Sequence, residues 1–199
     1  MIIDSSISFI KKYKKYSKED IEKLRYGMEG IYLTFTKFVV ILALSIILGI
    51  FKEVMFTLIF FNIIRYTGFG FHAEKSSQCL VLSLIYFILL PYIFIKIKFS
   101  TLFLFIICGL SIISFILFAP ADTKKRPLPN KKKRMIRKIF TVAIGIIYSC
   151  FIIIFQNSFI SPLILVALII EAVIIQPVFY KLFKQPYNNY KNYHKVLNT

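Results

Sequence analysis

The sequence contains no tryptophan, only three cysteines and only nine acidic residues among its 199 residues. The cysteines lack the spacing of a metal site, and Cys108 and Cys150 stand in apolar runs where such residues commonly pack. We therefore expect no metal site. The N-terminus also lacks a short apolar core followed by a small-residue cleavage site. We expect no removable signal peptide, and we expect the first membrane span to act as the signal.

Hydrophobic sequence, in contrast, is abundant. Hydrophobic residues make up 58% of the chain and its mean hydropathy is +0.73, which is too apolar for a soluble domain whose surface must carry polar groups. Helices satisfy their own backbone hydrogen bonds in lipid. The sequence therefore predicts an all-α integral membrane protein of one domain, with room for about five to seven spans of ~20 residues.

Six apolar runs are candidate membrane elements, at 31–50, 54–64, 80–95, 100–118, 139–155 and 159–180. The second is too short to cross ~30 Å of hydrocarbon alone, so it is either a short span extended by its flanks or a re-entrant segment. Lys and Arg, 26 in total, favour the cytoplasmic side of short loops. Six crossings place both termini and the loops 65–78 and 119–138 on that side. We therefore favour six crossings of the cell membrane with both termini cytoplasmic.

The chain divides into three parts around this bundle. Residues 1–29 are predicted to form an amphipathic cytoplasmic segment, because apolar residues recur there at helical spacing opposite lysines. Within it, Ser17 is the predicted N-cap of a short helix through Leu24 that leads into the bilayer. Residues 30–180 form the predicted transmembrane bundle. The tyrosine-rich tail, 181–199, is predicted to be a cytoplasmic anchor at the membrane interface.

The loop between the second and third runs, 65–79, combines a His, a Cys, a carboxylate and glycines. A nucleophilic thiol needs a neighbouring base to become a thiolate near neutral pH, and His72 is the only imidazole near Cys79 in the sequence. Seven residues of straight helix rise ~10 Å, beyond hydrogen-bond reach, so the segment must bend. Gly68 and Gly70 permit such a bend. The alternative is a structural role, with His72 at the water interface and Cys79 packed.

The residues just before Cys79 resemble the start of a helix. Ser76 or Ser77 is a natural N-cap, which puts Cys79 in the first helical turn. There the helix dipole favours a thiolate, and free backbone N–H groups can hold an oxyanion. From their place in the sequence alone, Glu74 is predicted to orient the imidazole and Gln78 to donate to the oxyanion.

This stretch resembles the accessory gene regulator protein B (AgrB) family of Gram-positive quorum-sensing systems. The family pattern is an Arg, glycines, a His-Ala pair and a Cys seven residues after the His, and the matching residues are Arg65, Gly70, His72, Ala73 and Cys79. The usual Gly-Gly pair is Phe69-Gly70 here, and Gly68, one place earlier, is expected to supply the lost flexibility. The segment 119–129 and the order of apolar runs extend the resemblance to most of the chain.

The resemblance implies a membrane cysteine endopeptidase with Cys79 as nucleophile and His72 as general base. The implied reaction cuts a short pro-signal peptide, leaves an acyl-thioester on the cysteine, and passes the acyl group to an internal Cys or Ser to close a thiolactone or lactone ring. A dry pocket at the membrane interface would favour cyclisation over hydrolysis. The implied substrate is an amphipathic peptide with an acidic C-terminal tail, the implied assembly is a homodimer, and no cofactor is implied.

The basic residues of the 119–138 loop are candidate substrate contacts. They either anchor the loop to anionic membrane lipid or capture an acidic peptide tail, and the two roles are compatible. They are Lys124, Lys125, Arg126, Lys131, Lys132 and Lys133. Nucleic acid is not an expected partner.

Two ionisable residues, Lys37 and Glu171, lie inside apolar runs. A charge is costly there unless it faces protein or water, so each is a candidate for function, with Glu171 a candidate substrate contact. The structural alternatives are that the two pair, that Lys37 snorkels to the interface from near the start of its run, and that Glu171 fixes helix packing. A rival hypothesis makes the chain a non-catalytic transporter or export channel for a small peptide, with these two residues as its polar path. A third makes it a scaffold that recruits partners through the basic loop.

Overall fold

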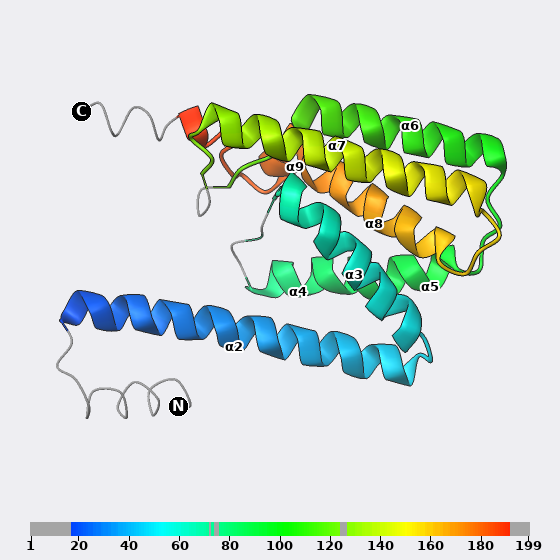
Figure 1. Cartoon of the computed structure of the whole chain (residues 1–199). Coiled ribbons are helices and arrows are strands. Elements are labelled where there is room, and N and C mark those ends of the chain that lie inside the picture. Colours follow the sequence, from blue (N-terminus) through cyan, green and yellow to red (C-terminus); the bar gives the residue numbers. More distant parts are fainter. Residues whose placement is uncertain (1–16, 72, 74–75, 124–126, 192–199) are drawn as a thin grey trace.

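A computed structural model describes residues 17–71, 73, 76–123 and 127–191, and these residues form a helical bundle (Figure 1). An isolated bridge joins Phe69 and Ala121. The elements are α2 (Lys18–Ile47), α3 (Phe51–Gly68), α4 (Ser76–Leu84), the π-helix η1 (Ile85–Leu89), α5 (Leu90–Phe94), α6 (Thr101–Phe118), α7 (Lys131–Ile154), α8 (Ser161–Ile174) and α9 (Pro177–Leu182).

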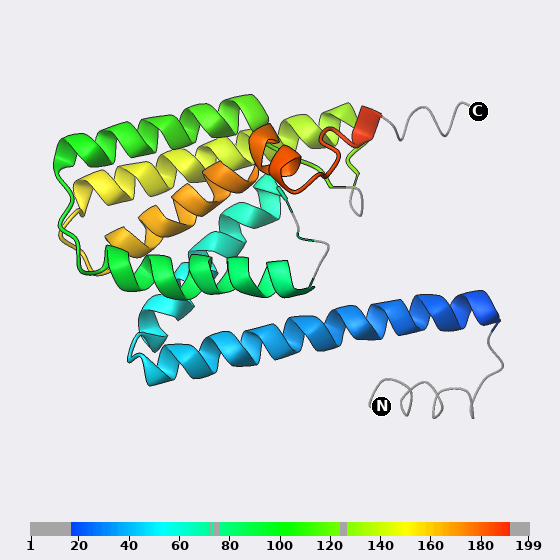
Figure 2. The same ribbon diagram turned by 180° about the vertical axis from the view of Figure 1, so that it is seen from behind.

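The helices α2, α3, α6, α7 and α8, and the rod formed by α4, η1 and α5, run lengthwise between the same two ends of the molecule, as Figures 1 and 2 show from opposite sides. The segments long and apolar enough to cross a membrane are Gly30–Ile47, Ser77–Phe94, Thr101–Phe118 and Lys131–Ile154. The helix α3 has 18 residues, about 27 Å at the standard rise per residue, and α8 has 14. The predicted all-α membrane fold is confirmed. The run 54–64 lies within the continuous helix α3, which is not among these four segments.

The helix α8 forms the centre of the bundle. Eleven of its 14 residues are buried, which is typical of a helix that is hydrophobic all round. The helices α3, α5, α6 and α7 pack around it. On α7, a Cβ at Gly145 would come within 2.7 Å of the Phe115 ring on α6, so only glycine permits this close packing.

The rod formed by α4, η1 and α5 contains one π-helical turn. The backbone N–H of Leu90 bonds to the carbonyl of Ile85, five residues back, immediately before Pro91. Proline lacks an amide hydrogen and its ring crowds the preceding turn, so a wider turn at this point accommodates it. The rod therefore continues to Phe94 despite the proline.

The helix α2 lies along one side of the bundle, against α3, α4 and η1. Ile41 and Ser45, four residues apart, are buried against it, whereas Ile31, Phe35 and Ile47 are exposed. In a membrane protein such exposed apolar side chains face lipid. The helix thus has one face toward the bundle and one toward the bilayer.

This first helix is longer than predicted. The Ser17 hydroxyl oxygen accepts a hydrogen bond from the backbone N–H of Asp20 at 3.1 Å, so the predicted N-cap is confirmed. The predicted end near Leu24 is wrong, because the apolar run from residue 31 prolongs the same helix to Ile47 without a break. The remainder of the predicted amphipathic segment, residues 1–16, lies outside the described residues.

Two other predicted boundaries also shift. The run 159–180 is two helices, because Pro177 has no amide hydrogen and disfavours helical backbone at the residue before it. The predicted loop 119–138 ends earlier, because Asn130 caps α7 by accepting a hydrogen bond from the backbone N–H of Lys133 at 3.1 Å. Residues 131–138 are therefore helical.

Candidate functional site

Cys79 is the fourth residue of α4 and is half-buried, so its predicted place in the first turn of a helix is confirmed. Ser76 is the first residue of that helix, so Ser76 and Ser77 lie within the first turn instead of capping it. Gln78 is exposed. His72 and Glu74 lie outside the described residues, and the His72–Cys79 contact stays a prediction.

The thiol of Cys79 contacts a cationic side chain from another helix. Nζ of Lys37, on α2, lies 3.1 Å from Sγ of Cys79 and donates to it, although the two residues are 42 positions apart. Of the alternatives for Lys37 and Glu171, their pairing with each other is wrong, because Lys37 contacts Cys79 and the carboxylate of Glu171 faces Arg65. The thiol is thus placed beside a positive charge.

Arg65, predicted as a supporting residue, holds the backbone of the loop that follows α3. Its guanidinium donates to three successive carbonyls, those of Phe69, of Gly70 at 3.0 Å and of Phe71 at 2.5 Å. A planar guanidinium presents several donors in a fixed geometry, which suits such a cluster of acceptors. Arg65 therefore fixes the course of the chain up to the residue before His72.

Glu171, on α8, lies behind Arg65. Its side chain is fully buried, and Oε2 is 3.7 Å from Nη1 of Arg65. Neither carboxylate oxygen has a hydrogen-bond partner among the described residues. The carboxylate therefore faces the guanidinium from inside the bundle, whereas a substrate contact would require access to the surface.

Two glycines allow this close packing. A Cβ on Gly68 would overlap the Glu171 carboxylate, and one on Gly70 would overlap the Arg65 guanidinium. Gly70 also has a φ of 103°, a backbone conformation that side chains disfavour. Gly70 was predicted as a supporting residue, and its role is to admit the guanidinium.

The bend expected at Gly68 occurs at Phe69 instead. Gly68 is the last residue of α3, while Phe69 itself has a φ of 62°. At this position, the family that the sequence resembles has a glycine. The bend therefore strains a bulky residue, whose ring lies 4.5 Å from the Arg137 guanidinium.

The two stretches that carried the family resemblance lie side by side. The N–H of Gly70 donates to the carbonyl of Ala121 at 2.7 Å, and the N–H of Ala121 donates to that of Gly68 at 3.0 Å. The N–H of Phe71 donates to the carbonyl of Ile174, at the end of α8, at 3.0 Å. The segment after α6 therefore forms a wall of the site.

Asp122 fastens this segment to the C-terminal tail, a role that sequence reasoning missed. The carboxylate is buried and accepts hydrogen bonds from the backbone N–H groups of Asn189 at 2.9 Å and Tyr190 at 2.7 Å. Burial raises the pKa of the nearby Tyr187 to about 12, and Asp122 adds to the effect. The only signal in the sequence was a lone acidic residue in a basic, proline-rich loop.

The basic residues predicted to meet substrate lie at the same end of the bundle. Lys131, Lys132 and Lys133 are exposed in the first turn of α7. Arg134 turns inward, donates to the carbonyl of Leu128 at 2.9 Å and stacks on the Tyr190 ring at 3.7 Å. Residues 124–126 lie outside the described residues. The three lysines are thus free to contact a peptide or a lipid headgroup.

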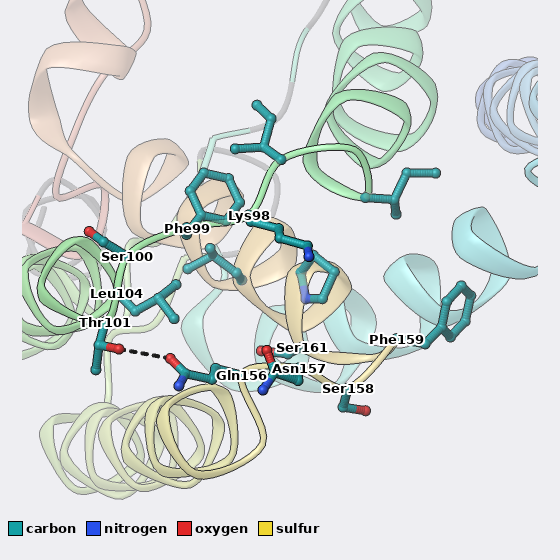
Figure 3. A pocket seen from close by; sticks show the side chains of 14 residues that line it. Lys98, Phe99, Ser100, Thr101, Leu104, Gln156, Asn157, Ser158, Phe159 and Ser161 are labelled. Carbon is teal, nitrogen blue, oxygen red and sulfur yellow. Dashed lines mark hydrogen bonds between the residues drawn. The ribbon is translucent and has the colours of Figure 1, made fainter.

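A polar hollow of about 440 Å³ lies at the opposite end of the bundle, between the α5–α6 and α7–α8 connections (Figure 3). Thr101 donates to the side-chain carbonyl of Gln156 at 3.0 Å along its edge. This hollow lies at the other end of the bundle from the start of α4, which carries Cys79, so the hollow is not part of the candidate site. Within the described residues, no three His, Cys, Asp or Glu side chains group as metal ligands.

Comparison with known proteins identifies the family of the chain. The sequence model of the family described as Accessory gene regulator B matches residues 3–175. This chain belongs to that family. It is 28% identical over 180 residues to accessory gene regulator protein B of Staphylococcus aureus, covering 89% of this chain and 94% of the relative. It is 28% identical over 179 residues to an AgrB-like protein of Listeria monocytogenes, covering 90% and 88%. No solved structure matches.

Membership of the AgrB family connects the chain to an accessory gene regulator system of the quorum-sensing type. Together with its apolar helices, it identifies a membrane protein. The match covers Arg65, the glycines and Cys79 within one continuous alignment range.

Proposed function

We propose that the chain is a membrane cysteine endopeptidase that cuts a short pro-signal peptide and cyclises it for quorum sensing. The observation that carries the proposal is the position of Cys79, in the first turn of α4 with Lys37 Nζ at 3.1 Å from its sulfur. A neighbouring cation favours the thiolate, which is the nucleophilic form. The loop held by Arg65 leads directly to His72, the proposed general base.

In the proposed reaction, the Cys79 sulfur bonds to the carbonyl carbon of the scissile peptide bond, and the C–N bond breaks. The C-terminal part leaves as an amine with a proton from the His72 imidazolium. An internal Cys or Ser of the peptide then attacks the thioester and gives its proton to the imidazole, and the S–C bond breaks. The products are a ring and the regenerated thiolate, and no cofactor takes part.

We place the site on the cytoplasmic side of the cell membrane, with both termini there. The end of the bundle that holds the site carries Lys131, Lys132, Lys133 and Arg134, whereas the opposite end carries Lys52, Glu53, Lys96 and Lys98. The excess of positive charge supports this orientation. Reporters fused after Lys75, Arg134 and Thr199 should score cytoplasmic and one fused near Ser158 should not; a split among the first three contradicts the topology.

The exposed lysines at the start of α7 are proposed to attract the acidic tail of the substrate, together with Lys124, Lys125 and Arg126, and to bind anionic lipid. Arg134 contacts Leu128 and Tyr190, and these contacts hold the start of α7 against the adjoining loop. The lysines at the start of α7 therefore have a fixed backbone position. A homodimer remains part of the proposal.

The transporter hypothesis has weaker support. It needs Lys37 and Glu171 to form one polar path, but Lys37 contacts Cys79 and Glu171 faces Arg65. The scaffold hypothesis gives Cys79 no role, although its thiol is placed beside a cation. The contacts of the described residues support neither the transporter hypothesis nor the scaffold hypothesis.

The test is processing of a co-expressed precursor in Cys79→Ser and His72→Ala variants. Both should abolish cleavage while the protein still inserts into the membrane in normal amount. Cys150→Ser, which changes an exposed cysteine on α7, and His194→Ala are the matched controls and should process normally. Normal processing by either Cys79→Ser or His72→Ala overturns the proposal.

A further inference from the structure

Lys37 stands in a costly place for a charge. It is in α2, within a segment apolar enough to cross a membrane, and its side chain is half-buried. A lysine near the centre of such a segment is costly unless it is paired or reaches water. Its ammonium group contacts the Cys79 sulfur, at 3.1 Å. A neutral thiol is a weak acceptor and compensates little of this cost, whereas a thiolate compensates much more.

The packing of α2 holds the ammonium group in place. Lys37, Ile41 and Ser45 follow one another at four-residue spacing on the same face of the helix. Ile41 is 4% exposed and Ser45 is fully buried, against the cluster that includes Phe87 of η1. The face that locks α2 to the bundle is therefore the face that presents Lys37 to Cys79.

We propose that Lys37 is a catalytic residue that stabilises the Cys79 thiolate, both as the attacking nucleophile and as the leaving group of ring closure. This rests on the proposed peptidase function. In the thioester intermediate the sulfur is neutral and the ammonium loses its counterion. Ring closure breaks the S–C bond, returns the electron pair to sulfur and restores the ion pair. Lys37 thus increases the fraction of Cys79 that is thiolate before the attack, and it favours the departure of that thiolate in ring closure.

Two readouts separate this role from a structural one. The first is the rate of Cys79 alkylation by iodoacetamide against pH, in membranes carrying a Cys108→Ser/Cys150→Ser background in which Cys79 is the single thiol. The second is precursor processing by the same proteins. An opposite charge at hydrogen-bond distance favours the thiolate over the thiol. Lys37→Met and Lys37→Gln should therefore slow alkylation at neutral pH by about tenfold and move the pH profile upward.

Lys37→Arg keeps the charge and should keep the profile near that of the parent. Lys52→Met is the matched control, since it removes an exposed lysine at the other end of the bundle and should change neither readout. Membrane amount and detergent elution profile verify that each variant is folded. Lys37→Gln keeps a polar side chain, and it replaces Lys37→Met in both measurements if Lys37→Met does not accumulate in the membrane.

The outcomes distinguish the two proposals. An unchanged alkylation profile in folded Lys37→Met or Lys37→Gln overturns the role of Lys37, even where Cys79→Ser abolishes processing and the peptidase stands. A shifted profile with processing that persists in Cys79→Ser overturns the peptidase, and the role of Lys37 in catalysis fails with it. A shifted profile together with a parallel loss of processing is the expected result.

Discussion

The carboxylate of Glu171 lies 3.7 Å from the guanidinium of Arg65, and the same guanidinium holds the three carbonyls that lead to the proposed base. A residue at the centre of the bundle is thereby connected to the loop of the site through one side chain. The carboxylate balances the charge of Arg65, which is otherwise surrounded by backbone dipoles. The loop geometry thus depends on a helix, α8, that contributes no predicted catalytic group.

Exchanging Arg65 for lysine should abolish processing without loss of the protein. The substituted side chain would keep the charge opposite Glu171, but a single ammonium cannot replace the planar set of donors that reaches three carbonyls. A displaced loop should reduce processing about a hundredfold, because small errors in catalytic geometry are that costly. Turnover of the precursor per membrane-inserted molecule measures the effect, with Lys98→Arg as the conservative control. Turnover by Arg65→Lys within twofold of the parent would contradict the proposed role of Arg65 in holding the loop.

Gly68→Ala should destabilise the protein, because the new Cβ overlaps the Glu171 carboxylate. Overpacking of this kind costs about 1–3 kcal/mol. The fraction that stays folded after heating in detergent should fall. Gly109→Ala is the control: nothing lies within 4 Å of the added Cβ, and alanine favours the helix, so stability should stay the same or rise. Equal heat stability of the two variants would refute the packing argument.

The positive φ of Phe69 predicts an unusual order of stability among its variants. Phe69→Ala and Phe69→Gly both lose the ring that stacks on Arg137, but only glycine removes the backbone strain at a φ of 62°. Phe69→Gly should therefore be the more stable of the two by about 1 kcal/mol. Thermal unfolding in detergent compares them directly. The reverse order would show that this conformation carries no strain.

Replacing Lys131, Lys132 and Lys133 with glutamine should raise KM for a precursor with an acidic tail and leave kcat unchanged. A lysine near an anionic partner contributes ~1 kcal/mol, so a rise of about tenfold or more is expected. Added salt should reproduce the effect in the parent protein. The assay uses vesicles of zwitterionic lipid, so that binding to anionic lipid does not contribute. Lys96→Gln/Lys98→Gln, at the far end, is the control; a fall in kcat alone would point to a structural defect instead.

Local sequence was sufficient for much of this fold. Each hydrophobic run falls on a helical part of the described chain, and the capping residue Ser17 marked the start of α2. The place of Cys79 in a first turn followed from the polar residues before it. The end of the last run was missed although Pro177 marked it, and Asn130 gave a similar signal for α7.

Local sequence patterns did not predict the tertiary contacts. Pairing of Lys37 with Glu171 was one of the alternatives, because both are charges in apolar sequence, but charge alone cannot select among partners many residues apart. The neighbours of a helix decide the pairing, and α2 packs on α4. The strain at Phe69 was likewise hidden, since it follows from the hydrogen bonds of Gly68 and Gly70 to Ala121.

The contact of Asp122 with Asn189 and Tyr190 has a consequence for the timing of activity. The wall beside the loop is fastened by the backbone N–H groups of Asn189 and Tyr190, which lie far along the chain from Cys79. During synthesis, Cys79 emerges from the ribosome more than a hundred residues before these residues do. A nascent chain therefore carries the nucleophile long before the enclosure around it is complete. For the proposed peptidase, competence to process peptide therefore requires that Asn189 and Tyr190 have already been synthesised, and removing these two residues should abolish it.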